Sequence, residues 1–187
     1  DPSCSITVGG NWTRGQNALF IHGNGTVLFN AAGGSVTIDP RSSAFGNITF
    51  NGGATFMLDR DEIYTDLNFT IASGTVQPVV NNYELYIKGN YTNSGGNYDN
   101  TINGTVLFNG TNDQLITNAH FWHVIIDGSG NKSTSGTTVI DGNLTVVNSN
   151  FVCGNPVDMN NYVTIETTGG FNDGDFTHTF SGYRWIG

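Results

Sequence analysis

Short segments that alternate between apolar and polar residues run along nearly the whole chain. The apolar pairs are Ile6/Val8, Val36/Ile38, Ile48/Phe50, Phe69/Ile71, Leu85/Ile87, Leu144/Val146 and Val163/Ile165, and threonine or tyrosine stands between the two members of each pair. Because successive side chains of a strand point to opposite faces, each segment is predicted to be a strand with one buried and one solvent face. No window of about eleven residues has a helical stripe, so we predict about twelve short strands and an all-β fold.

The strand pattern also recurs at long range. Residues 25–30 are identical to residues 104–109, a shift of 79 (104 minus 25), and residues 6–12 match residues 85–91 at the same shift. Two further matches have slightly smaller shifts: residues 45–52 match 121–128 at a shift of 76 (121 minus 45), and residues 68–71 match 143–146 at a shift of 75 (143 minus 68). This pattern predicts a single all-β domain over residues 1–187, with strand-rich repeats of about 76–79 residues at about 6–82 and 85–161 and a partial third at 162–187. Tandem units of this kind fold by stacking, which favours a β-solenoid or stacked β-arches; a β-sandwich with Greek-key connections is the alternative.

Composition narrows the functional classes. Charged residues make up 11% of the chain and aromatic residues 12%, which is unlike a disordered chain. The net charge of −9 argues against nucleic acid and against an anionic membrane surface, and no apolar run is long enough to span a bilayer. The chain starts Asp1-Pro2-Ser3-Cys4 with no signal peptide, as expected of an exported protein after processing.

Nine Asn-x-Ser/Thr sequons support a secreted, extracellular or cell-surface location. They are candidate glycosylation sites at Asn11, Asn24, Asn47, Asn68, Asn90, Asn103, Asn109, Asn131 and Asn143. Turns and strand entries rich in Asn and Thr also generate such triplets, so we expect glycan on only some of them.

Two cysteines in a secreted chain predict one disulfide between Cys4 and Cys153. Within one chain this bond would close a loop of about 150 residues, which loop-entropy models credit with about 5 kcal/mol. In a head-to-tail stack, Cys153 of one subunit could instead meet Cys4 of the next. Both pairings stay open at this stage.

Candidate chemistry is sparse. Asp59-Arg60-Asp61-Glu62 is a dense charge cluster, and a glycosidase would need Asp61 close to Asp127 or Asp141, but a charged loop is the simpler interpretation. His120 and His123 would point to opposite faces of a strand, so no metal site is predicted from them. Residues 172–175 resemble part of a calcium loop, but the Glu that an EF-hand requires is Phe180 here. We predict no enzyme, no catalytic residue and no cofactor, with calcium unsupported at any particular site.

The strings at 85–91, 104–111, 121–126 and 142–146 resemble the repeats of large secreted surface proteins of archaea and bacteria. A short, acidic, cysteine-containing version is most similar to the major sheath proteins of filamentous methanogenic archaea. That resemblance implies amyloid-like polymerisation through β-strands into a cell-encasing sheath.

The pattern therefore predicts a structural, self-assembling subunit of a sheath, filament or surface layer. Its partner would be another copy of itself, through the strand edges at Ile6, Val8, Val163 and Ile165. The alternative is a carbohydrate-binding or adhesive module of a larger surface protein, with aromatic platforms such as Trp122 recognising cell-surface glycans. A polysaccharide-active enzyme that depends on Asp59, Asp61 or Asp141 ranks third.

Overall fold

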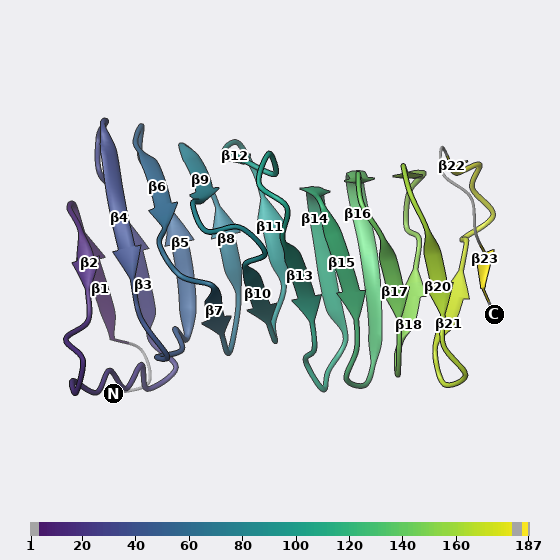
Figure 1. Cartoon of the computed structure of the whole chain (residues 1–187), viewed down its shortest axis with the longest axis horizontal. Coiled ribbons are helices and arrows are strands. Elements are labelled where there is room, and N and C mark those ends of the chain that lie inside the picture. Colours follow the sequence, from purple (N-terminus) through teal and green to yellow (C-terminus); the bar gives the residue numbers. More distant parts are fainter. Residues whose placement is uncertain (1–3, 181–184, 187) are drawn as a thin grey trace.

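The computed structural model describes residues 4–180 and 185–186 and is a parallel β-solenoid of about nine turns (Figure 1). The described residues contain no helix, so no helix among them could cross a membrane. The predicted all-β solenoid is confirmed, whereas the antiparallel Greek-key sandwich is not what the chain forms. The described residues form 23 strands instead of about twelve, because many have only two or three residues.

Three sheets run side by side along the axis of the solenoid. The long sheet contains, in order, β1 (Ser5–Val8), β3 (Thr26–Phe29), β5 (Asn47–Phe50), β8 (Phe69–Ile71), β11 (Tyr91–Asn93), β14 (Gln114–Phe121), β16 (Asn131–Ile140), β18 (Asn150–Val152) and β21 (Gly170–Asn172), with β19 (Val157–Met159) and β22 (Thr179–Phe180) branching from β16. The five-stranded sheet contains β2 (Trp12–Thr13), β4 (Ser35–Asp39), β6 (Thr55–Leu58), β9 (Thr75–Pro78) and β12 (Asn97–Tyr98). The seven-stranded sheet contains β7 (Glu62–Thr65), β10 (Glu84–Ile87), β13 (Thr105–Phe108), β15 (His123–Ile126), β17 (Leu144–Val146), β20 (Val163–Ile165) and β23 (Trp185–Ile186).

The unit that stacks is a single turn. Paired residues in neighbouring turns of the long sheet are 21 residues apart at β1 and β3 (Thr26 minus Ser5), 25 at β11 and β14 (Ile116 minus Tyr91) and 18 at β14 and β16 (Lys132 minus Gln114). β3 lies in the long sheet, whereas its identical copy β13 lies in the seven-stranded sheet. The shift of 79 residues between them is therefore not a whole number of turns. The sequence likeness therefore relates strands on different sides of one solenoid.

The core lies between the sheets and is filled by one alternating face of each strand. Its aromatic side chains form a ladder along the axis: Phe29 stacks on Phe50 at 5.5 Å, and Phe69 stacks on Tyr91 at 5.8 Å between ring centroids. All four are fully buried. Each such pair contributes about 0.5–1.5 kcal/mol beyond its buried area, so the ladder ties successive turns together.

The cross-section changes where the five-stranded sheet ends. In β14 and β16 the strands of the long sheet are longer, with eight and ten residues, and bend, with a register shift between Thr117 and Ala119. Asn118 (φ 51°) and Gly136 (φ 72°) lie at the bends of β14 and β16, and the backbone N–H of Thr137 donates to the Asn118 side-chain oxygen at 3.2 Å. The second halves of β14 and β16 thus continue along the side that β12 occupied, and β14 contacts β12.

Candidate functional site

The two ends of the stack are the candidate functional surfaces, and they lie at opposite ends of the long axis (Figure 1). At the N-terminal end, β1 pairs with β3 on one side, and its other edge has no partner among residues 4–180 and 185–186. Ile6 is 40% exposed there, while Val8 is half-buried against the core. The predicted edge at Ile6 and Val8 therefore lies on an outermost strand.

A loop at the N-terminal end adds apolar surface that the alternation pattern did not reveal. Leu19 and Ile21 are 78% and 77% exposed, and between them Phe20 packs on Trp12 with 5.0 Å between ring centroids. Phe20 and Ile21 also line a cavity of about 240 Å³ together with Ile6. The signal in the sequence was the unbroken triplet of apolar residues 19–21 in a segment without strand alternation.

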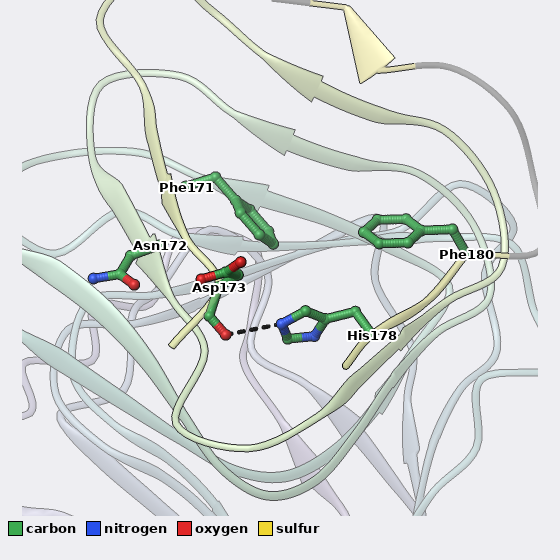
Figure 2. A pocket seen from close by; sticks show the side chains of 5 residues that line it. All are labelled: Phe171, Asn172, Asp173, His178 and Phe180. Atoms are coloured by element: carbon green, nitrogen blue, oxygen red, sulfur yellow. Dashed lines mark hydrogen bonds between the residues drawn. The ribbon is translucent and has the colours of Figure 1, made fainter. Parts of the chain in front are cut away.

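At the C-terminal end, the described edge strand of the long sheet is β21, which pairs with β18. A cavity of about 650 Å³ opens beside it, lined by Phe171, Asn172, Asp173, His178 and Phe180 (Figure 2). The imidazole of His178 bridges two turns, since its Nδ1 accepts the N–H of Val157 at 3.1 Å and its Nε2 lies 2.9 Å from the carbonyl oxygen of Asp173. This end is therefore a shaped surface with aromatic and acidic groups.

The predicted edge at Val163 and Ile165 needs correction. Both residues lie on β20, which pairs with β17 on one side and with β23 on the other. Val163 is buried and Ile165 packs against the core. The prediction failed because the first strand of the partial third repeat was taken as an open edge, whereas the stack continues past it through β21, β22 and β23.

The two ends carry opposite charges. Residues 4–38 contain Arg14 and no carboxylate, whereas residues 153–180 contain Asp158, Glu166, Asp173 and Asp175 and neither lysine nor arginine. Asp173 lines the C-terminal cavity itself. Like-charged ends would repel each other, while the acidic C-terminal end and the N-terminal end are electrostatically compatible.

The cysteines do not meet within one chain. Cys4 precedes β1 and Cys153 follows β18, seven strand steps away in the long sheet, which is roughly 34 Å at the usual spacing between strands. A disulfide requires Cα atoms within about 7 Å, so the intrachain alternative is wrong. Both thiols are free; Cys4 is exposed, and Cys153 is buried in the core, where burial raises its pKa to about 12. An intermolecular bond through Cys153 would need the last turns to open.

Several of the predicted glycosylation sites form a ladder of side chains at one corner of the solenoid. The Asn47 side-chain oxygen accepts from both the backbone and the side-chain nitrogen of Asn68, at 3.2 and 3.1 Å. The Asn68 oxygen then accepts the backbone N–H of Asn90 at 2.9 Å, and the Asn90 oxygen accepts the N–H of Leu115 at 2.8 Å. These asparagines hold neighbouring turns in register, a structural role that accounts for their recurrence.

The other sequons are dispersed over the corners. Asn11 accepts the N–H of Thr37 at 2.9 Å, and Asn131 accepts from the Asn150 side chain at 3.2 Å. Asn24 and Asn103 are exposed, whereas Asn109 and Asn143 are half-buried.

The acidic residues weighed for glycosidase chemistry are not brought together. Asp61 precedes β7, whereas Asp127 follows β15, three strand steps or roughly 14 Å along the stack, and Asp141 lies near β17, four steps or roughly 19 Å away. Both spacings exceed the range of about 5–9.5 Å that glycoside hydrolysis uses. Asp59, Arg60 and Asp61 form the connection between β6 and β7, as a charged loop was expected to do.

Asp141 instead organises a polar cluster. Its carboxylate lies 2.7 Å from His120 Nε2 and accepts from the side-chain nitrogens of Asn100 and Asn160 at 2.7 and 2.9 Å. Burial alone would raise the pKa of the Asp141 carboxyl, but these hydrogen bonds lower that pKa below its usual value. His123 lies on a different strand and accepts the N–H of Asn143, so the two histidines serve separate contacts.

No set of three metal-ligating side chains converges among the described residues. In the predicted calcium-like segment, the side-chain oxygens of Asn172 and Asp173 accept the N–H groups of Gly174 and Asp175, which makes an ordinary turn.

The aromatic residues divide between the core and the surface. Trp12 and Tyr91, which match at the 79-residue shift, lie on different sheets, and both pack into the core ladder. Trp122 lies at the corner between β14 and β15, half-buried and outside the core cluster, with its ring 6.2 Å from that of His123.

No protein family model matches this chain, and neither a curated protein nor a solved structure is similar to it.

Proposed function

We propose that this protein is a structural subunit that assembles head to tail, with the C-terminal edge of one copy pairing with the N-terminal edge of the next, in an extracellular sheath, filament or surface layer. The observation behind the proposal is the outer edge of β1, which has no partner among the described residues and lies beside exposed Ile6, Leu19 and Ile21. An edge strand with free backbone groups and an apolar surface is a template for another strand.

Strand direction favours one mode of pairing. All strands of the solenoid are parallel, so a copy placed on β1 continues the long sheet in parallel only if it offers its β21 end. A head-to-head contact would instead reverse the strand direction at the junction. Head-to-tail contacts are heterologous and generate open filaments. With nine strands along the long sheet, each copy would add roughly 43 Å to the axis.

Charge supports the same polarity. The junction would bring Arg14 towards the end that carries Asp158, Glu166, Asp173 and Asp175. Exposed charges are screened over about 8 Å at physiological ionic strength, so salt should slow assembly without abolishing it.

The test is the double variant Ile6→Asp/Val8→Asp, examined by negative-stain electron microscopy and light scattering next to wild type. We expect wild-type polymers with an axial repeat near 43 Å and only monomers from the variant, because two carboxylates would be desolvated at the junction. Thr49→Asp is the matched control, since Thr49 faces outwards on the interior strand β5. Dispersed wild-type monomers at high concentration, or normal polymers from the variant, would refute the proposal.

A mixing experiment tests the polarity. The double variant retains the C-terminal end, so a small fraction added to wild type should bind to one end of each growing polymer and stop growth there. Shortened polymers in proportion to the added variant are expected from head-to-tail growth. Unchanged polymer lengths would contradict it.

A carbohydrate-binding or adhesive module is the second candidate, and the position of Trp122 favours it. This half-buried indole lies beside the corner where Asp141 gathers His120, Asn100 and Asn160. An aromatic face next to polar groups is typical of saccharide sites. Binding on a glycan array that disappears in Trp122→Ala would support this function, and an array without binding would exclude it for the glycans tested.

A further inference from the structure

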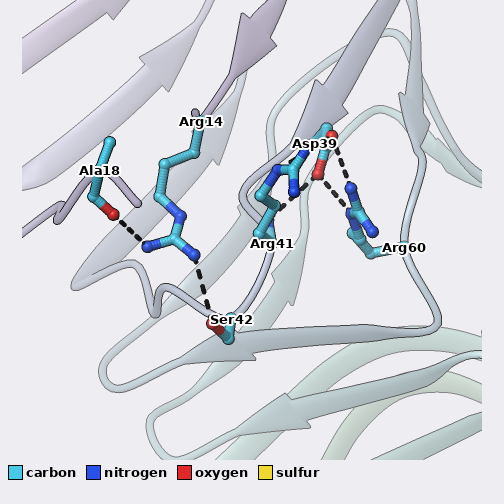
Figure 3. Close-up of polar contacts among 6 residues, drawn as sticks. All are labelled: Arg14, Ala18, Asp39, Arg41, Ser42 and Arg60. Atoms are coloured by element: carbon cyan, nitrogen blue, oxygen red, sulfur yellow. Dashed lines mark hydrogen bonds and ion pairs between the residues drawn. The ribbon is translucent and has the colours of Figure 1, made fainter. Parts of the chain in front are cut away.

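Three arginines converge on one corner of the solenoid, in a protein with only six lysine and arginine residues and a net charge of −9. Arg14 follows β2, Arg41 lies two residues after β4 and Arg60 two residues after β6, in three successive turns of the five-stranded sheet. Together they line a cleft of about 250 Å³, and Figure 3 shows their guanidinium groups side by side. The stacking of successive turns therefore brings together three of the few positively charged side chains, which are far apart in the sequence.

One of these arginines, Arg60, is held in a structural ion pair. Arg60 donates to both oxygens of the Asp39 carboxylate, through Nε and, at 2.8 Å, through Nη2. The hydrogen bond from Arg60 lowers the pKa of the Asp39 carboxyl, which is only 9% exposed. This bidentate pair forms a fixed wall of the cleft.

Neither of the other two guanidinium groups donates a hydrogen bond to a carboxylate among the residues that the structure describes, although Arg41 forms a long ion pair with Asp39. Arg14 donates to the carbonyl oxygen of Ala18 and, at 3.2 Å, to the hydroxyl of Ser42, which are both uncharged. Arg41 Nε is 4.0 Å from the nearer oxygen of Asp39, too long for a hydrogen bond. Positive charge is therefore available in the cleft.

Arg41 also adopts a backbone conformation that its residue type disfavours. Its φ is 53°, in the left-handed region where glycine or asparagine is usual. The turn uses the backbone of Arg41 and the side chain of Asp39, since the Arg41 N–H donates to Asp39 Oδ1 at 3.2 Å. A glycine would serve this turn at least as well, so the side chain of Arg41 is not required by the fold.

Acceptors line the same cleft, namely the carboxylates of Asp61 and Glu62 and the amide of Gln16. A bare inorganic anion offers few or no donors to these acceptors. A uronic acid presents one carboxylate, which matches the planar fork of arginine, and several hydroxyl groups that can donate to the acceptors. The volume is below the range of about 300–1,000 Å³ of drug-sized ligand sites, so it suits one sugar unit. We propose that this cleft binds a uronic-acid unit of an acidic polysaccharide through Arg14 and Arg41.

The test measures binding of an oligogalacturonate to the full chain by isothermal titration calorimetry. The comparison ligands are the same oligomer with its carboxylates methyl-esterified, inorganic phosphate, and poly-glutamate as a source of protein-type carboxylates. We expect binding of the free uronate only, weakened at least tenfold by esterification and at least tenfold by Arg14→Gln or Arg41→Gln. Lys88→Gln removes the same charge from an exposed pair with Asp66 outside the cleft, and should leave affinity unchanged.

Arg41→Gly separates binding from folding. If Arg41 serves a ligand, this variant loses affinity at least tenfold while its melting temperature is unchanged or higher, because the strained φ is relieved. A lower melting temperature with normal affinity would assign Arg41 a structural role and overturn the proposal. The proposal also fails if the oligogalacturonate does not bind, if Lys88→Gln weakens binding as much as the cleft variants, or if phosphate or poly-glutamate binds as tightly as the uronate.

Discussion

Replacing Gly52 with alanine should destabilise the solenoid, because the corner after β5 has no room for a methyl group. A Cβ at Gly52 would lie 2.2 Å from the carbonyl oxygen of Ala31 in the preceding turn, a separation that real Cβ atoms do not show. The obstacle is backbone, so no side-chain rotation can relieve it. The two turns would have to move apart by roughly 1 Å to restore van der Waals contact.

That displacement determines how much free energy of unfolding the Gly52→Ala substitution costs. The corner is flanked by the hydrogen bonds from Asn51 N–H to the Phe29 carbonyl at 2.8 Å and from Thr55 N–H to the Gly34 carbonyl at 2.9 Å. Lengthening each by roughly 1 Å removes both, at about 1–2 kcal/mol each. Alanine also reduces the entropy of the unfolded chain, which returns about 0.4–1 kcal/mol. The net loss is about 1–3.5 kcal/mol, or a fall in melting temperature of about 3–12 °C for a chain of this size.

Gly33→Ala is the matched control for Gly52→Ala. Gly33 lies in the corresponding corner one turn earlier, and a Cβ there would meet no atom within 4 Å. Thermal unfolding followed by circular dichroism should give Gly33→Ala the wild-type melting temperature or a slightly higher one. Equal melting temperatures for Gly33→Ala and Gly52→Ala would refute the argument that turn-to-turn contact controls this position.

Three further predictions concern the core and the corners. Alkaline pH should destabilise the protein: burial raises the pKa of Tyr83 and Cys153 to about 12 from 10.0 and 9.0, so the unfolded chain loses these protons first, and the contribution of the two groups to the free energy of unfolding, constant below about pH 9, should fall between pH 9 and 12; an alkaline midpoint unchanged in Cys153→Ala would assign the effect to other groups. Phe50→Ala should cost about 3–5 kcal/mol in chemical denaturation, because it removes a rung of the aromatic ladder, whereas the outward-facing neighbour Thr49→Ala should cost under about 0.5 kcal/mol. In material glycosylated by its source, mass spectrometry should find Asn68 less occupied than Asn24 and Asn103, although all three are exposed, since its side-chain nitrogen is engaged in the ladder; full occupancy would show that this corner opens before folding is complete.

Prediction of the fold from the sequence worked where the signal was local. Alternation between apolar and threonine-rich positions identified the strands because each turn buries one face of every strand, and the inward set Ile48, Phe50, Phe69 and Ile71 is fully buried. Two-residue strands such as β2 and β12 were not recognised, because alternation is not visible over two positions.

The candidate sites were less predictable, because each depends on the path between strands. Val163 and Ile165 begin the incomplete third repeat and were therefore predicted to form an open edge, but the residues after them add further strands, so those positions are interior. The arginine cleft had no local signal, since Arg14, Arg41 and Arg60 are separated by 27 and 19 residues (41 minus 14 and 60 minus 41) and belong to three different turns.

The sequence by itself determined that this chain is a stack of strands, through side-chain alternation, turn residues and recurring short segments. Such a segment can form a strand on any side of a solenoid. Only the tertiary structure decided which side each strand occupies: residues 25–30 and 104–109 are identical, yet they lie on different sheets. The physical reason is that a strand's own residues specify which face is buried, whereas its neighbours are set by the length of each turn, from 18 to 26 residues between paired positions. The placement of every surface group, from the separated cysteines to the clustered arginines, follows from those turn lengths.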